Sequence, residues 1–170
     1  MSFLEAYEEF KIYASKRHKK QGFVTLASDF KSKIVPYFSN YNIEDITSKD
    51  IVGWQNYIYD LNLKNSYMSK LYIEFSGFMK YCCDFHNLKS NPVKDVGNFK
   101  KRFEEKKFDF YTLDEFKLFI KFVDNNIYKQ FFNLMFFTGT RPGEAMALKF
   151  SDLNSGYISI TKNLTTKGGR

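Results

Sequence analysis

The sequence has little of several residue types whose abundance defines other classes of protein. Its two cysteines are the neighbours Cys82 and Cys83, which cannot build the disulfide framework of a small secreted domain. Nine glycines and three prolines among 170 residues are too few for a collagen-like or low-complexity chain. Uninterrupted apolar runs are short, far below the ~20 residues that cross a bilayer, and the acidic N-terminus differs from a signal peptide. The sequence therefore favours a reducing, cytoplasmic setting and no membrane.

What the sequence has in abundance is aromatic and basic residues. Hydrophobic residues make up 44% of the chain and include 20 phenylalanines and 12 tyrosines, so most of the chain has enough apolar surface to fold. The 26 lysines and arginines exceed the 19 acidic residues, which gives a net charge of +7. A basic balance indicates an anionic partner, nucleic acid first of all, although basic proteins of this size are also common without one.

Apolar side chains recur with helical spacing through the first ninety residues. The spacing predicts four helices, at about residues 3–20, 25–38, 47–61 and 66–85. Thr47 and Asp50 form a capping-box-like start of the third helix, and Pro36 is expected to kink or fray the end of the second. Residues 1–92 are therefore expected to form a small four-helix bundle, closed by Asn91-Pro92.

The remaining residues predict a linker and a second, incomplete unit. Residues 93–110 carry no good periodicity and several basic residues, which is typical of an interdomain linker. Residues 111–170 then begin with a capping box at Thr112 and Glu115. A helix over about 126–137 is apolar on most sides and is expected to be buried. Residues 157–161 alternate like a strand, for which the sequence offers no partner.

Arg141 is the residue that local chemistry singles out. It lies in a glycine-containing turn at the start of a short helix, where backbone amides favour anions. Its planar, permanently charged guanidinium matches the geometry of a phosphate. The alternative is a solvated arginine in an ordinary capping turn, with Glu144 as a simple capping carboxylate.

The sequence around Arg141 also resembles a known family. The segment with this likeness reads Thr138-Gly139-x-Arg141-x-x-Glu144-x-x-x-Leu148-Lys149-Phe150-Ser151-Asp152-Leu153. It is similar to the first catalytic box of the tyrosine recombinases, the phage-integrase family. Tyr111 to Glu115 resembles the start of that family's catalytic domain, and residues 1–92 resemble its core-binding, SAM-like domain. The resemblance implies a mainly α fold: a four-helix SAM-like bundle followed by a truncated, mostly helical start of an α+β catalytic domain.

The resemblance also implies roles for individual residues. Arg141 matches the arginine that binds the scissile phosphate while a tyrosine attacks to form a 3′-phosphotyrosyl link, and Glu144 matches an acid that helps to organise the site. Such electrostatic stabilisation of developing charge needs no cofactor or metal in this family. Double-stranded DNA at attachment sites is the implied partner, and family members assemble as tetramers.

Several residues that the family requires are missing from the sequence. No His-x-x-Arg follows Glu144, and no tyrosine follows Tyr157, whose strand context does not match that of the nucleophile. Lys162 and Lys167 are candidates for the hairpin lysine of the family. The chain is therefore expected to be an integrase without its C-terminal half and to cleave no DNA by itself.

Three groups of residues are expected to contact DNA. The start of the fourth helix suits phosphate and base-edge contact, although an ordinary capped helix start explains it equally well. Its residues are Lys64, Asn65, Ser66, Tyr67, Ser69 and Lys70. The other candidates are the basic residues Lys16, Arg17, Lys19 and Lys20, and the linker residues Lys100, Lys101 and Arg102.

Three functions stay open for the chain, and a metal site is not expected. The chain is either the DNA-binding portion of a mobile-element recombinase or a non-catalytic DNA-binding or regulatory protein derived from one. A helical protein-interaction module with incidental charge is the third alternative. A metal site at Cys82-Cys83-x-x-His86 is not expected, because His18 is the only further histidine and zinc usually takes four ligands.

Overall fold

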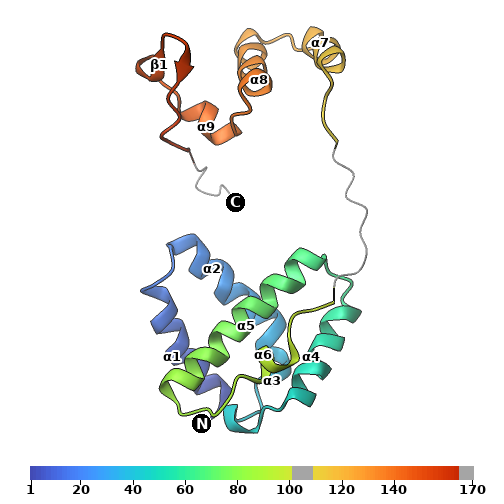
Figure 1. Ribbon diagram of the computed structural model, residues 1–170, viewed down its shortest axis with the longest axis vertical. Coiled ribbons are helices and arrows are strands. Elements are labelled where there is room, and N and C mark those ends of the chain that lie inside the picture. Colours follow the sequence, from blue (N-terminus) through green and yellow to red (C-terminus); the bar gives the residue numbers. More distant parts are fainter. Residues whose placement is uncertain (101–108, 165–170) are drawn as a thin grey trace. The chain divides into compact units, whose positions relative to one another are not determined.

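The structure is a computed structural model, and it describes residues 1–100 and 109–164 of the chain. The chain divides into two compact units, Met1–Glu105 and Lys106–Arg170. Each unit is mostly helical, which agrees with the fold class expected from the sequence (Figure 1). Within the described residues, no helix combines the length and the apolar character needed to cross a membrane.

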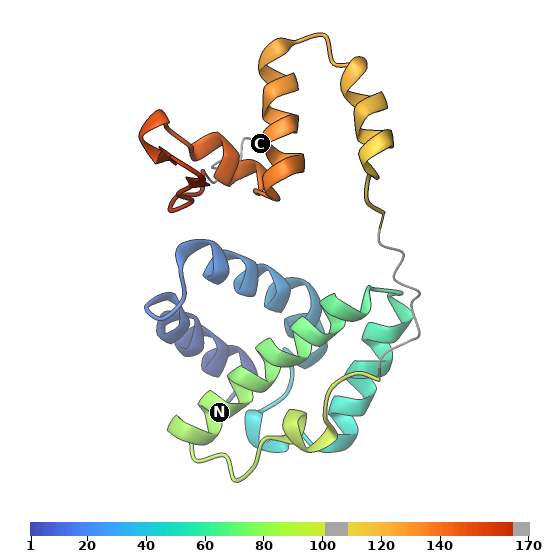
Figure 2. The ribbon, with the colours of Figure 1, turned by 45° about the horizontal axis from the view of Figure 1, so that its top comes forward.

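The first unit is a helical bundle built around one long helix. Its elements are α1 (Phe3–Ser15), α2 (Lys20–Asp29), the π-helical turn η1 (Phe30–Ile34), α3 (Val35–Phe38), the 3-10 turn η2 (Ile43–Asp45), α4 (Ser48–Asp60), α5 (Asn65–Phe85) and α6 (Pro92–Val96). Helix α5 crosses the bundle diagonally between α1 and α2 on one side and α4 on the other, as two views of the ribbon show (Figures 1 and 2).

The core of the first unit is aromatic. The rings of Tyr7 and Phe30 stack with centroids 4.8 Å apart, and Trp54 meets Phe75 edge to face at 5.1 Å. Aromatic pairs in these arrangements stabilise a core beyond the area that they bury. The large side chains that are fully buried include Phe3, Phe30, Phe38, Trp54, Phe75 and Phe78.

A capping box fixes where α4 begins. The Thr47 amide donates a hydrogen bond to Asp50 Oδ2 at 2.9 Å, and the Asp50 amide donates to Thr47 Oγ1 at 3.4 Å. Such reciprocal bonds satisfy amide groups that otherwise lack a partner at a helix start. The capping-box prediction at Thr47 and Asp50 is confirmed.

The second helix begins earlier than its sequence pattern indicates and changes geometry before Pro36. Helix α2 starts at Lys20, not near residue 25, and it passes into the turn η1, where the Val35 amide donates to the Phe30 carbonyl. Pro36 has no amide hydrogen, and its ring crowds the carbonyl four residues earlier, so a wider turn before it relieves the clash. The predicted disturbance near Pro36 is confirmed, and it lies upstream of the proline.

The first unit continues past residue 92, where the sequence pattern indicated a linker. Val93 in α6 is buried, and the ring of Phe99 lies 5.6 Å from that of Trp54. Gln55 Nε2 also donates a hydrogen bond to the Gly97 carbonyl at 2.8 Å. Residues 93–99 therefore belong to the core of the first unit, because two isolated apolar residues dock there without forming a periodic pattern.

The second unit contains short helices and a small hairpin. Its elements are α7 (Leu113–Lys121), α8 (Asn126–Thr138), α9 (Pro142–Ala147), the 3-10 turn η3 (Phe150–Asp152), β1 (Leu153–Asn154) and β2 (Tyr157–Ile158). The two strands are antiparallel, with Leu153 opposite Ile158 and a left-handed Gly156 at the turn. The expectation of a strand without a partner was wrong, because a partner of two residues is too short to leave a pattern.

Helix α8 differs most from its expectation. The sequence predicted a buried helix, yet none of its residues is buried among the described part of the chain, and Ile127 is 80% exposed. Phe136 stacks on Phe116 of α7 at 3.9 Å, but the opposite side borders an open apolar groove of about 980 Å³. Phe131, Phe137 and other apolar side chains line this groove. The described residues of this unit supply too little surface to cover the helix.

Candidate nucleic-acid interface

The turn between α8 and α9 presents Arg141 to solvent. Gly139 ends α8 with a left-handed backbone (φ +68°), and its amide donates to the Met135 carbonyl at 2.9 Å. Glycine adopts this conformation without a steric penalty, which explains its position after the helix. The chain then enters α9 at Pro142, so Arg141 precedes the first turn of that helix.

Two threonines support this turn from beneath. Thr140 is buried, and its hydroxyl lies 3.0 Å from that of Thr138, which also accepts the Thr140 amide at 3.4 Å. Thr138 Oγ1 donates to the Leu134 carbonyl in the last turns of α8. The backbone before Arg141 is thereby held by side chains on both sides of Gly139.

Arg141 and Glu144 form one polar pair at the start of α9. The Arg141 amide donates to Glu144 Oε2 at 2.8 Å, and its Nη1 donates to Glu144 Oε1 at 2.9 Å. The hydrogen bond from the Arg141 amide, and after it the bond from the guanidinium, lower the pKa of Glu144 below its usual range. The Arg141 side chain is 80% exposed, so its guanidinium can still meet an anion from solvent.

Of the two candidate hairpin lysines, Lys162 lies within the residues that the structure describes. Lys162 Nζ lies 3.8 Å from Asp152 Oδ1, a weak and half-exposed ion pair. Two residues later the Leu164 amide donates to the Gly143 carbonyl at 2.9 Å, so this segment returns to α9, next to Arg141. Lys167 lies outside the described residues.

The start of α5 carries most of its expected polar residues at the surface. Lys64 immediately precedes the helix, and Lys64 and Ser66 are exposed. Asn65 and Ser69 are half-buried. The structure thus places these four residues in the first turns of one helix, as the sequence indicated.

Lys70 has other surroundings than its neighbours. Its Nζ contacts Asp29 Oδ2 at the end of α2 and pairs with Glu74 Oε1 at 3.0 Å. Burial opposes the charge on Lys70, but its hydrogen bonds to both carboxylates raise its pKa. Tyr67 Oη donates to the other oxygen of Asp29 at 2.7 Å. This geometry argues against Lys70 as a free DNA contact, since its charge is already neutralised.

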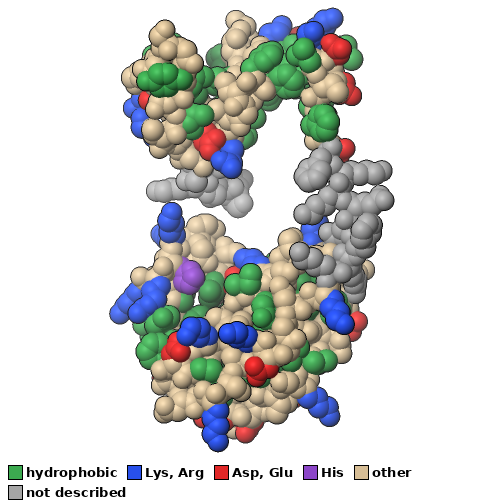
Figure 3. Space-filling model, viewed as in Figure 1, with side chains coloured by type: hydrophobic (Ala, Val, Ile, Leu, Met, Phe, Trp, Pro, Cys, Tyr) green, Lys and Arg blue, Asp and Glu red, His purple; other side chains and the backbone are tan. Residues whose placement is uncertain are grey.

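The basic residues between α1 and α2 form an exposed turn instead of the expected end of the first helix. Helix α1 stops at Ser15, and Lys16, Lys19 and Lys20 are exposed beyond it. The Arg17 guanidinium lies over the Tyr13 ring at 3.7 Å, a cation–π contact. Figure 3 shows lysine and arginine side chains gathered at this end of the bundle. Of the linker candidates, Lys100 is exposed, whereas Lys101 and Arg102 lie outside the described residues.

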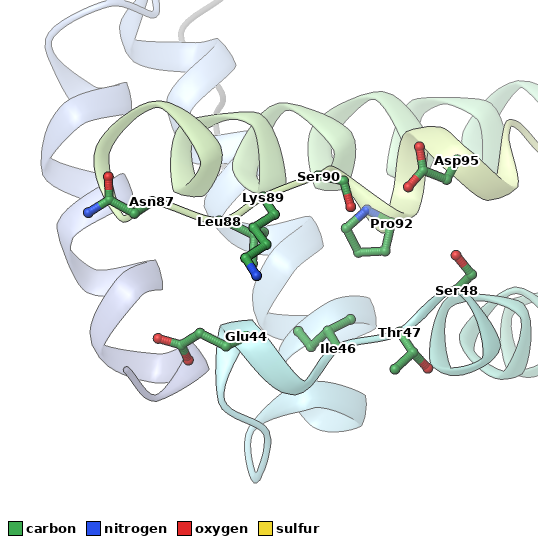
Figure 4. Close-up of a pocket in the computed structure, with 10 residues that line it drawn as sticks. All are labelled: Glu44, Ile46, Thr47, Ser48, Asn87, Leu88, Lys89, Ser90, Pro92 and Asp95. Atoms are coloured by element: carbon green, nitrogen blue, oxygen red, sulfur yellow. The ribbon is translucent and has the colours of Figure 1, made fainter.

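A hollow elsewhere on the first unit lacks the character of a nucleic-acid site. It measures about 410 Å³ and lies between the start of α4 and the loop from α5 to α6 (Figure 4). Its lining carries charges of both signs, from the acidic Glu44 and Asp95 and the basic Lys89. Glu44 is moreover bonded to the N-terminal ammonium of Met1 at 3.0 Å.

Cys82 and Cys83 are free thiols, the first buried and the second half-buried. Burial is the main cause that raises the pKa of Cys82 to about 12, so its thiol stays protonated. His86 Nε2 instead lies 3.2 Å from Glu9 Oε2. In the part of the chain that the structure describes, no group of three or more His, Cys, Asp or Glu side chains is placed to hold an ion.

Comparison with known proteins bears on the family that the chain resembles. Residues 2–59 match the family model described as phage integrase, N-terminal SAM-like domain. The chain is 28% identical over 129 residues to the ICEBs1 integrase of Bacillus subtilis (strain 168). This alignment covers 75% of the chain and 34% of the relative, so the chain spans about a third of the length of that curated protein.

Two solved structures share the fold. The chain matches a lambda integrase dimer bound to a COC′ core site with a TM-score of 0.74 and 20% identity, over 93% of this chain and 45% of that one. It matches the integrase-like domain from Bacillus cereus with a TM-score of 0.56 and 19% identity, over 65% of this chain and 94% of that one. The first unit is therefore an integrase-type SAM-like bundle. The chain is thus similar to the tyrosine recombinases, or phage integrases, and its residues 2–59 match the N-terminal SAM-like domain of phage integrases.

Proposed function

We propose that the chain is the DNA-binding portion of a site-specific tyrosine recombinase of a mobile element. The observation that carries the proposal is the exposed guanidinium of Arg141, held at the start of α9 in a chain with an integrase-type bundle. The net charge of +7 and the exposed basic turn between α1 and α2 support a polyanionic partner. The lambda integrase dimer, whose structure matches 93% of this chain, was solved bound to a core site.

In the complete enzyme, Arg141 would bind the scissile phosphate. A tyrosine hydroxyl attacks the phosphorus, the bond to the 5′ oxygen breaks, and a 3′-phosphotyrosyl link keeps the energy of the phosphodiester. Arg141 would stabilise the charge that develops on the non-bridging oxygens, and Glu144 would orient it through the pair described above. No tyrosine follows Tyr157 in the sequence, so for this chain alone we propose DNA binding without cleavage.

The wider setting belongs to the same proposal. The partner is double-stranded DNA with attachment or core sites, and the complete enzyme would act as a tetramer in the cytoplasm. The proposed chemistry is exchange of phosphodiesters and requires no cofactor.

A salt titration of DNA binding tests the proposal. Binding of the chain to a labelled duplex is measured by fluorescence anisotropy from 50 to 300 mM salt. Contact with about 5–8 phosphates predicts a slope of log K against log salt of roughly −4.5 to −7. Absence of binding at 50 mM salt would contradict the proposal.

The pairing of Arg141 with Glu144 favours a second candidate, a non-catalytic DNA-binding or regulatory protein. A guanidinium already bonded to a carboxylate can serve as a capping residue alone. Arg141→Ala separates the two functions. A phosphate contact predicts that the salt slope becomes smaller by about 0.9, whereas a capping role leaves the slope unchanged. Lys121→Ala, which removes an exposed charge from α7, is the matched control.

A further inference from the structure

The contact between α2 and α5 contains more acid than base. Asp29 is only 6% exposed, and it meets Tyr67 and Lys70 from α5. Lys70 also pairs with Glu74, one turn further along the same helix. Two largely buried carboxylates therefore share one half-exposed ammonium group, and unbalanced charge on buried groups is costly.

One carboxylate oxygen of Glu74 accepts no hydrogen bond from the described residues. Glu74 Oε1 accepts from Lys70 at 3.0 Å, whereas Glu74 Oε2 is buried and has no hydrogen-bond partner among the described atoms. Buried polar atoms are nearly always paired, so an orphaned carboxylate oxygen needs a physical explanation. The neighbouring Asp29 carboxylate can accept a hydrogen bond but cannot donate one.

The groups around Glu74 come from three helices. Helix α2 contributes Asp29, and α5 contributes Tyr67 and Lys70. Helix α1 contributes Tyr7. Burial, and after it the charges of Glu8 and Glu74, raise the pKa of Tyr7 to about 12. Lys11 pairs with Glu8 at 2.7 Å and lies 5.2 Å from the Tyr7 ring. Near neutral pH, Glu74 is therefore the group of this cluster whose charge is least compensated.

We propose that Glu74 is a proton-binding positioning residue, whose Oε2 takes a proton from solvent and donates it in a hydrogen bond to Asp29. The proton removes the excess negative charge and adds a bond between α5 and α2. Burial, above all, and the charge of Asp29 raise the pKa of Glu74, although Lys70 opposes the shift. The contact thus fixes the first turns of α5 against α2 more firmly as the solution becomes mildly acidic.

Because the pKa of Glu74 is raised in the folded chain, protonation of Glu74 stabilises the first unit. A carboxyl with a raised native pKa binds its proton more tightly in the folded than in the unfolded chain. Its contribution to stability is complete below the unfolded value of about 4.5 and is lost as the pH rises through the native pKa. Glu74→Gln carries a permanent donor in the same shape, and therefore does not lose this contribution.

Thermal unfolding between pH 4.5 and 8 tests the proposal in the full chain. The only tryptophan, Trp54, is buried in the first unit, so its fluorescence reports on this unit alone. Glu74→Gln should raise the Tm above that of the wild type by roughly 4 °C or more at pH 8, and the difference should shrink toward pH 4.5. Parallel Tm curves of the two proteins over this range would overturn the proposal.

Two further variants keep the result interpretable. Asp84→Asn alters the exposed Lys80–Asp84 pair, which has the same spacing on the same helix, and should leave the pH profile as in the wild type. Asp29→Asn keeps an oxygen that can accept the Glu74 proton but removes the neighbouring negative charge, and should therefore make the pH dependence of the Tm smaller. A profile unchanged by Asp29→Asn would also overturn the proposal.

A second readout connects the cluster with DNA and rests on the proposed function. If the start of α5 contacts DNA, the affinity of the wild type should rise on acidification more than that of Glu74→Gln, measured on the same duplex at pH 5.5 and 8. Equal changes in both proteins would contradict a positioning role. Failure of the wild type to bind DNA would refute the proposed function, whereas the Tm comparison would still decide the role of Glu74.

Discussion

Arg141 and Lys70 are basic residues near the starts of two helices, and their surroundings are opposite. The Arg141 side chain is 80% exposed and shares its guanidinium with one carboxylate from its own helix turn. Lys70 is 40% exposed and is shared by two carboxylates, one of them on another helix. A solvated guanidinium keeps donors for an incoming phosphate, whereas a lysine between two acids has lost most of its attraction for one. Charge at a helix start is therefore informative only together with its partners.

Thr47 provides a prediction at the same scale. Hydrogen bonds from its side chain, and then from its backbone, lower the pKa of Asp50 below the ordinary 3.8. The stability gained from a lowered pKa is complete above the unfolded value and is lost as the pH falls through the native one. Thr47→Ala should therefore destabilise the first unit by about 1 kcal/mol at pH 7 and by less at pH 3. Urea unfolding followed by Trp54 fluorescence at both pH values measures the difference.

A threonine without an acidic partner is the control for this experiment. Thr25 Oγ1 donates to the Gln21 carbonyl within α2, so Thr25→Ala should have a small effect that does not depend on pH. A Thr47→Ala deficit that is equal at pH 3 and pH 7 would show that Asp50 takes no part in the cap.

At the scale of elements, the sequence predicted helices whose signals are local. The capping boxes at Thr47 and Thr112 and the apolar stripe of α5 lie within a few turns of chain, and the structure contains each of them. The start of α5 was located in the same way. The exposed position of Arg141 also follows from its own turn, since Gly139 and Pro142 are neighbours in sequence.

Other features depend on contacts between distant residues and leave no local pattern. Asp29 lies 41 residues before Lys70, so nothing in the α5 sequence shows that this lysine is neutralised. The i, i+4 spacing of Lys70 and Glu74 is the one signal that could have indicated the pair. Strand β1 has two residues, which is too few for periodicity.

Phe99 gives a prediction for the element that the sequence pattern missed. It is 5% exposed and contacts Trp54 and Tyr59 through its ring. Phe99→Ala should therefore destabilise the first unit by about 3 kcal/mol, as expected for a buried phenylalanine, and change Trp54 fluorescence. Phe85→Ala, at a 58% exposed position of α5, should cost much less. Equal losses would mean that residues 93–99 do not belong to this core.

At the scale of the whole molecule, the question is whether net charge or its placement attracts DNA. Lys16, Lys19 and Lys20 lie together in the exposed turn between α1 and α2. Lys49, Lys89 and Lys94 are also exposed, and they lie in α4, in the loop after α5 and in α6. Each set of three accounts for the same part of the net charge of +7, so the two sets form a matched pair.

Replacement of all three lysines in either set by alanine separates placement from net charge. If the turn contacts phosphates, loss of Lys16, Lys19 and Lys20 should make the salt slope of DNA binding smaller by up to about 2.7, because counterion release scales with contacted phosphates. The Lys49, Lys89 and Lys94 triple variant should keep the slope and weaken binding only slightly, since distant charges are screened beyond about 8–10 Å at physiological salt. Equal changes in both variants, measured by anisotropy on one duplex, would mean that the turn attracts DNA only through its share of the total charge.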